Sequence, residues 1–171
     1  MVKKKAPDLV ILDADSIVFK CAAANEERTI TVTYKPNGKT KNFKNRTEFK
    51  EWLEKQEKKW DKEDFDITDI QTPGPLHNTL HSVKMMIQGI LTKLECQNYV
   101  VTLSGDYNFR DDIPLPQKYK WNREGQIKPL HLPDVFKYVK EYYQPVIAEG
   151  CEADDVQAHY VTKGLKEKKK V

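Results

Sequence analysis

The chain has 171 residues, a length that suits a single domain with a hydrophobic core of its own. Charged residues make up 32% of the chain and hydrophobic residues 39%, a balance that excludes an intrinsically disordered protein. The formal net charge of +3 is too small to establish a polyanionic partner, so the positions of the charges are more informative than their sum.

The sequence carries no pattern of a membrane span, a signal peptide or a cysteine-based site. Its apolar runs are only a few residues long, and the basic segment 1–7 is not followed by an apolar stretch of signal-peptide length. We therefore expect a cytoplasmic protein with no membrane partner. Cys21, Cys96 and Cys151 share no metal-ligand spacing, which argues against a zinc site and against a disulfide scaffold.

The first predicted strand is the apolar run 9–12, which is typical of a strand buried on both faces in a parallel sheet. It ends at Asp13, and the segment 16–27 that follows predicts a helix, of which Asp15 could be the N-cap. A strand that ends in an aspartate and leads at once into a helix places that carboxylate at the carboxyl edge of the sheet. Open α/β folds bind their ligands at this edge.

An inserted β-hairpin is predicted at 29–45. The segment 29–34 alternates and is rich in β-branched residues, Asn37-Gly38 is a strong turn signal, and 39–43 forms the returning strand. The lysines of the hairpin could contact phosphates, although such a hairpin is more often a solvated edge.

A helix is predicted after the hairpin, with Thr47 as its N-cap and its end at about Trp60. The aspartate-rich segment 61–72 is interpreted as a solvated loop. The prolines of Thr72-Pro73-Gly74-Pro75 then mark a clear break.

A long helix is predicted at 76–94 and a second buried strand at 99–103. The arch-like loop that follows, 105–130, interleaves cations with aromatic rings. The residues of this pattern are Tyr107, Phe109, Arg110, Lys118, Tyr119, Lys120, Trp121, Arg123 and Lys128. Because bases stack on aromatic rings and phosphates pair with cations, such a loop is typical of single-stranded nucleic-acid binding. An ordinary polar loop fits less well, since long loops without secondary structure are uncommon in compact domains.

The remaining elements are a helix from Leu132, a third buried strand at 145–148 and a last helix to about Gly164. Three buried strands that alternate with helices predict an α/β fold. Its central sheet would be doubly wound, mainly parallel and flanked by helices, with the β-hairpin as an insertion. Four carboxylates lie between the third strand and the last helix, at Glu149, Glu152, Asp154 and Asp155.

This acidic cluster has two interpretations. Carboxylates are favoured in the first turn of a helix, because the macrodipole stabilises negative charge there. Together with Asp13 and with Asp106 after the second strand, they would also form a pool of oxygen ligands at one sheet edge. Such a pool, without histidine or thiolate, selects Mg²⁺ or Mn²⁺ and commonly serves phosphoryl chemistry. A nucleotide-cofactor domain is the weaker interpretation, because the sequence has no glycine-rich phosphate loop.

Four segments of the chain carry a resemblance to a known family. They are Leu12-Asp13-Ala14-Asp15-Ser16, the helical segment 80–84, Asn108-Phe109-Arg110 together with 119–123, and Glu152-Ala153-Asp154-Asp155. In this order they resemble the phage and bacterial 5′–3′ exonucleases and flap endonucleases, members of the wider PIN-like nuclease group. The resemblance implies a Mg²⁺- or Mn²⁺-dependent hydrolase that cleaves phosphodiester bonds of DNA with a 5′ end or flap. If the protein is encoded by a phage, it would act in the host cytoplasm.

The resemblance also implies roles for individual residues. The metal ligands of the family match Asp13, Glu152, Asp154 and Asp155. The family's second-strand aspartate matches Ser104 in one alignment and Asp106 in another, which makes Asp106 a candidate ligand. Lys120 and Arg123 would act on the scissile phosphate, and Arg110, Tyr119, Lys120 and Arg123 would bind DNA. The pattern of cations and rings in the same loop adds Lys118 to the expected DNA-binding residues.

The family continues with a fourth strand, a further pair of metal-binding aspartates and a helical clamp on duplex DNA. We therefore expect residues 1–171 to form the N-terminal part of the nuclease domain. The complete two-metal site would then need a C-terminal nuclease half as a second chain. Two alternatives stay open, a DNA-binding fragment without catalysis and a PIN-type ribonuclease.

Overall fold

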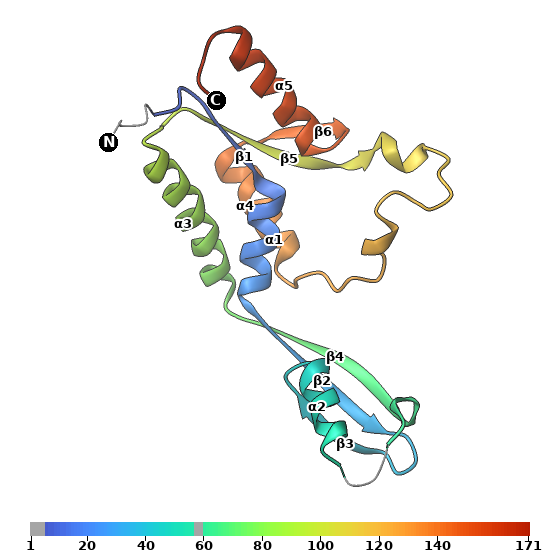
Figure 1. Ribbon diagram of the computed structural model, residues 1–171. Helices are drawn as coiled ribbons and strands as arrows, with labels where there is room; N and C mark the ends of the chain where they lie inside the picture. The colour runs from blue at the N-terminus through green and yellow to red at the C-terminus, as the bar shows by residue number, and fades with distance from the viewer. Residues whose placement is uncertain (1–5, 57–59) are drawn as a thin grey trace. The chain divides into compact units, whose positions relative to one another are not determined.

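A computed structural model of the protein describes residues 6–56 and 60–171. Over these residues it is a mixed α/β structure, with one parallel and one antiparallel sheet. The chain divides into two compact units (Figure 1). The first unit contains Met1–Ala24 and Pro75–Val171, and the second is Asn25–Gly74. None of the helices in the described residues is long and apolar enough to cross a membrane.

The first unit is built on the parallel sheet, in the strand order β1-β5-β6. These strands span Val10–Asp13, Tyr99–Asn108 and Val146–Gly150. Asp13 pairs with Thr102, and Ser104 pairs with Ala148, so the carboxyl ends of all three strands lie at one edge. The three strands predicted from the apolar runs are confirmed, although β5 continues beyond its predicted end at residue 103.

Four helices flank this sheet in the described part of the first unit. They are α1 (Ala14–Ala24), α3 (Leu76–Leu94), α4 (Leu132–Tyr143) and α5 (Ala153–Lys166). Helix α1 packs against α3 and α4, whereas α5 contacts β1, β5 and β6 (Figure 1). The bounds of α3 are those predicted. Helix α1 ends earlier than predicted, because Glu26 and Glu27 belong to the next strand.

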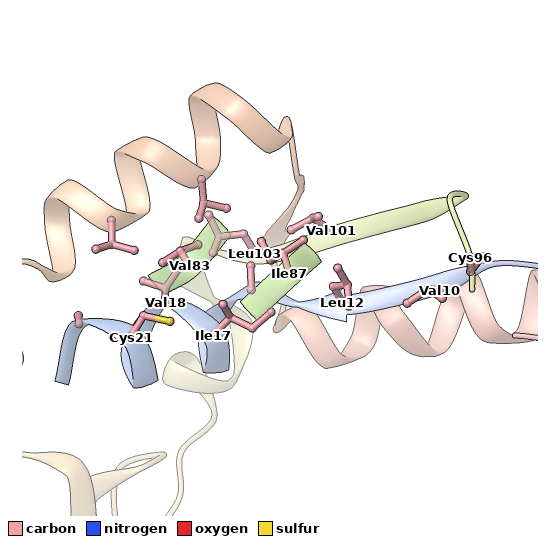
Figure 2. Packing of buried hydrophobic residues seen from close by; sticks show 14 residues of the cluster. Val10, Leu12, Ile17, Val18, Cys21, Val83, Ile87, Cys96, Val101 and Leu103 are labelled. Carbon is pink, nitrogen blue, oxygen red and sulfur yellow. The ribbon is translucent and has the colours of Figure 1, made fainter. Parts of the chain in front are cut away.

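The core of the first unit joins the sheet to α1, α3 and α4. Figure 2 shows Val18 of α1, Val83 of α3 and Leu103 of β5 gathered in this core, and all three are fully buried. Burying an aliphatic side chain of this size stabilises the fold by about 1.5–3 kcal/mol. These contacts fix the direction in which β1 and β5 deliver their carboxyl ends.

Strands β5 and β6 approach each other closely at Gly105. A Cβ atom at this position would lie 2.7 Å from the carbonyl oxygen of Ala148. The pairing of β5 with β6 is also irregular between Ser104 and Asn108. Glycine therefore permits an approach that any side chain would obstruct.

The second unit is the antiparallel sheet β3-β2-β4 with helix α2. Its elements are β2 (Glu26–Tyr34), β3 (Lys39–Phe43), α2 (Arg46–Glu54) and β4 (Phe65–Pro73). The two strands of the predicted hairpin are confirmed. Ile30, Val32, Phe43 and Phe49 form a small core of their own, which explains why this unit is compact by itself.

Three predictions for the second unit are wrong. Asn45, and not Thr47, caps α2, since its side chain accepts the Glu48 N–H at 2.9 Å. The helix ends at Glu54, and the 57–59 part of its predicted length lies outside the described residues. The segment 61–72 is not a loop, because most of it belongs to β4, which pairs with β2 along its whole length. An edge strand tolerates the charged side chains that had suggested a loop.

Candidate functional site

A cavity of about 390 Å³ opens at the carboxyl edge of the parallel sheet. It is bounded by the turns from β1 to α1 and from β6 to α5, and by part of the connection between β5 and α4. The lining residues are Asp13, Asp15, Ser16, Ser104, Tyr119, Lys120, Arg123, Glu152, Ala153 and Asp154. Three of the predicted metal ligands thus share a cavity with both residues expected to act on the phosphate.

Asp13 caps helix α1 at the end of β1. Its Oδ1 accepts the N–H groups of Asp15 at 3.0 Å and Ser16 at 3.4 Å, and its Oδ2 accepts the Ser16 hydroxyl. These bonds satisfy backbone donors that the first turn of a helix leaves without partners. The N-cap role considered for Asp15 therefore belongs to Asp13.

Asp15 faces the central strand. Its carboxylate accepts the Ser104 hydroxyl at 2.5 Å and the Ser104 N–H at 3.2 Å. The Ser104 hydroxyl oxygen in turn accepts the N–H of Ala153 at 3.2 Å. Asp15 is thereby held in the cavity by neutral donors.

Glu152 is paired with two residues of the arch-like connection. Its Oε1 accepts from the Lys120 ammonium group, and its Oε2 accepts the Tyr119 hydroxyl at 2.7 Å. The Lys120 contact, followed by the Tyr119 hydrogen bond, lowers the pKa of Glu152. The same hydrogen bond to Glu152 raises the pKa of Tyr119. Glu152 is therefore an ionised carboxylate that already has a cationic partner.

Asp155 lies beside the cavity and pairs with Arg110. The guanidinium donates to both carboxylate oxygens, at 2.7 and 3.0 Å. This bidentate contact, with the Glu152 N–H as a further donor, lowers the pKa of Asp155 to about 2. The pKa of Arg110 is raised by the same contact. The bond from the Glu152 N–H also places Asp155 in the first turn of α5 as a helix-capping residue.

Asp154 differs from its neighbours, because it is exposed and has no hydrogen-bond or ion-pair partner among residues 6–56 and 60–171. The acidic residues that line the cavity supply only oxygen donors, and the lining contains neither histidine nor cysteine. This donor chemistry fits Mg²⁺ or Mn²⁺. In the part of the chain that the structure describes, no three acidic, histidine or cysteine side chains already lie close enough together to hold a metal ion, so the carboxylates would have to draw together to bind one. Because Glu152 contacts Lys120, a cation in this cavity would also compete with Lys120 for Glu152.

Two predicted site residues lie elsewhere. Asp106 lines a separate cavity of about 430 Å³, together with Glu149 and Lys140. Asp106 lies apart from the first cavity because β5 continues to Asn108, past the part of the strand that lines that cavity. Lys118 points into solvent, with 86% of its side chain exposed, and its nearest acidic partner is Glu124 at 3.9 Å.

The connection between β5 and α4 contains two short 3₁₀ turns, Phe109–Asp112 and Trp121–Arg123. Lys120 precedes the second turn in the left-handed region, with φ of 55°. Left-handed backbone is uncommon for residues other than glycine and asparagine. Here it accompanies the contact of the Lys120 ammonium with Glu152.

The sequence interpretation did not anticipate two features of this site. The first is the contact between Asp15 and Ser104, and the second is the pairing of Arg110 with Asp155. Comparisons of the chain with protein-family models, with curated proteins and with solved structures found no match. The chemistry of the cavity is therefore inferred from its residues, which could hold a divalent cation through carboxylates and a phosphate through Lys120 and Arg123.

Proposed function

We propose that this chain is the N-terminal part of a metal-dependent 5′–3′ exonuclease or flap endonuclease that acts on DNA. The observation that carries the proposal is the cavity in which Asp13, Glu152 and Asp154 lie together with Lys120 and Arg123. Metal-dependent hydrolysis of a phosphodiester uses both kinds of group, carboxylates that hold a cation and cationic side chains that stabilise the phosphate. The parallel sheet with its acidic edge supports a doubly wound, PIN-like arrangement as the corresponding fold.

In this proposal each group of residues has a separate task. Asp13, Glu152 and Asp154 would hold Mg²⁺ or Mn²⁺, and a bound cation would supply the Lewis acid that activates water and stabilises the leaving oxygen. Lys120 and Arg123 would stabilise negative charge on the transferring phosphate. Tyr119 offers a ring for base stacking within reach of the cavity.

Cleavage of a labelled 5′-flap DNA in Mg²⁺ by the chain together with its C-terminal partner tests the proposal, with replacement of Asp154 as the decisive change. Asp154→Ala should abolish cleavage and leave DNA binding without metal nearly intact, because this side chain has no structural partner in the described residues. Glu141→Gln, a change on the exposed face of α4, is the matched control and should retain cleavage. Equal cleavage by wild type and Asp154→Ala would refute the metal-site assignment. Faster cleavage of single-stranded RNA than of flapped DNA would favour the ribonuclease alternative.

A partner chain belongs to the proposal, because the site is expected to need a second set of carboxylates. Strand β1 is an outer strand of the sheet. The Val10 N–H points to the side of β5, where it donates to the Asn98 carbonyl at 3.0 Å. Backbone groups of neighbouring strand residues point to opposite sides. The Leu9 N–H accordingly bonds the carbonyl of Lys170, at 3.3 Å. The chain's own C-terminal segment thus occupies the start of this edge, and the outer edge of β1 beyond it could accept a strand from a C-terminal nuclease half.

Co-expression with the product of the neighbouring reading frame tests the partner. The two chains should elute as one complex from size-exclusion chromatography, and the complex should cleave faster than the 171-residue chain. Cleavage at full rate by the purified chain would contradict the need for a partner.

A DNA-binding fragment without catalysis is the second candidate. The observation that favours it is the pairing of Glu152 with Lys120 and of Asp155 with Arg110, which neutralises two acidic residues without any metal. DNA binding that is unaffected by Mg²⁺, with no cleavage even in the complex, would support this candidate.

A further inference from the structure

Ser104 lies half-buried on the central strand β5 and connects both acidic turns of the cavity. Its hydroxyl donates to Asp15 at 2.5 Å and accepts from the N–H of Ala153 at 3.2 Å, and its own N–H donates to Asp15 at 3.2 Å. Asp15 belongs to the first turn of α1, and Ala153 is the first residue of α5. One hydroxyl group thus joins three elements that are distant in the sequence.

The position of this hydroxyl has consequences for the carboxylates. Asp13 precedes Asp15 by two residues, while Glu152 and Asp154 flank Ala153 in the sequence. The N–H of Ala153 is one of the first-turn donors that have no partner inside the helix. Ser104 supplies that partner and at the same time orients Asp15. One side chain therefore connects the two acidic turns through hydrogen bonds.

We propose that Ser104 is a positioning residue, which sets the affinity of the cavity for a divalent cation by aligning the β1–α1 turn with the β6–α5 turn. This inference rests on the proposed function, since it assumes that the carboxylates bind a cation. Residues that hydrogen-bond directly to metal ligands commonly change metal affinity by about 10–100-fold when they are replaced. Ser104 bonds Asp15 and Ala153, which adjoin the proposed ligands in the sequence, so its effect should lie at the lower end of this range. Asp15 participates as the partner through which Ser104 acts on the β1–α1 turn.

Calorimetric titration of the 171-residue chain with Mn²⁺ tests the proposal, using Ser104→Ala and Ser104→Thr. The alanine variant loses the hydroxyl and should bind Mn²⁺ about 10-fold more weakly. The threonine variant keeps the hydroxyl on a residue that strands accept well, so its affinity should stay close to that of the wild type. Circular dichroism establishes that each variant is folded, and Glu141→Gln serves as the matched control on α4.

A second comparison separates positioning from a general loss of stability. If Ser104 acts with Asp15 as one unit, Ser104→Ala should have little further effect on affinity in an Asp15→Ala background, because the two changes are coupled. A folded Ser104→Ala variant with wild-type Mn²⁺ affinity, or equal losses for the alanine and threonine variants, would overturn the inference alone. A wild-type chain that binds no Mn²⁺ would overturn the proposed function and this inference with it.

Discussion

Replacing Lys120 with alanine should strengthen the binding of a divalent cation and weaken the binding of DNA. Both effects follow from the position of its ammonium group inside the cavity. There it contacts Glu152, a proposed ligand of the cation, and it lies where the phosphate of the DNA would bind. The Glu152 side chain is only 19% exposed, and the Lys120 contact is the main cause of its lowered pKa. Without the ammonium group, this carboxylate keeps the Tyr119 hydroxyl and is available to a cation.

The size of the effect on cation binding follows from the exposure of the pair. Because 37% of the Lys120 side chain is exposed, solvent screens the attraction. We therefore use the upper end of values for exposed ion pairs, about 1 kcal/mol. A free energy of this size corresponds to about fivefold tighter binding of Mn²⁺ or Mg²⁺. The DNA affinity should fall, and the slope of log K against log salt should decrease by about 1, as expected for one lost phosphate contact.

Two measurements on the same protein samples check this prediction. Calorimetry gives the cation affinity, and fluorescence anisotropy of a labelled flap DNA in EDTA gives the DNA affinity at several salt concentrations. Lys137→Ala is the matched control, because Lys137 is a lysine of α4 whose side chain is 76% exposed. Weaker cation binding by Lys120→Ala would refute the competition between Lys120 and the cation. An unchanged salt slope would refute its contact with phosphate.

Two further predictions concern stability. Ile87→Ala should lower the free energy of unfolding, measured in urea, by about 2–5 kcal/mol, because Ile87 is 1% exposed in the core. Met85→Ala, on the exposed face of α3, is the control and should change this free energy by less than about 0.5 kcal/mol. The Asp155 carboxyl has its pKa lowered from 3.8 to about 2, so its contribution to stability is present above the unfolded pKa and is lost as the pH falls from about 4 to about 2. Asp155→Asn should therefore show a shallower decline of the urea midpoint over this interval, and parallel declines would contradict the assignment.

The parallel sheet could be predicted from the sequence because its signals are local. The apolar runs that became β1, β5 and β6 each lie within a few residues, and so does the Asn37-Gly38 turn between β2 and β3. Strand β4 could not be predicted in this way, because its stability comes from pairing with β2, a partner more than thirty residues away. Its acidic composition is typical of a loop when the pairing is unknown.

The site could be predicted in part for a similar reason. The position of Asp13, Glu152 and Asp154 around one cavity follows from a general rule, since parallel strands bring their carboxyl ends to one edge. The contacts that organise the site obey no such rule. Asp15 and Ser104 are 89 residues apart, and Arg110 and Asp155 are 45 apart. Such contacts depend on the register of the strands and on the path of the arch-like connection, which hydrophobic patterns do not specify.

The acidic residues differ in how far their carboxylates are already used for helix capping or ion pairing, and therefore in how readily they could bind a cation. A carboxylate has two oxygens and about four lone-pair sites, so a capping bond leaves room for a cation. Asp13 uses both oxygens for α1 but has no cationic partner among the described residues, and capping holds it in place. Asp155 has both oxygens on Arg110 and could bind a cation only if that contact opened. Cation affinity should therefore depend most strongly on Asp154, then on Asp13 and Glu152, and least on Asp155.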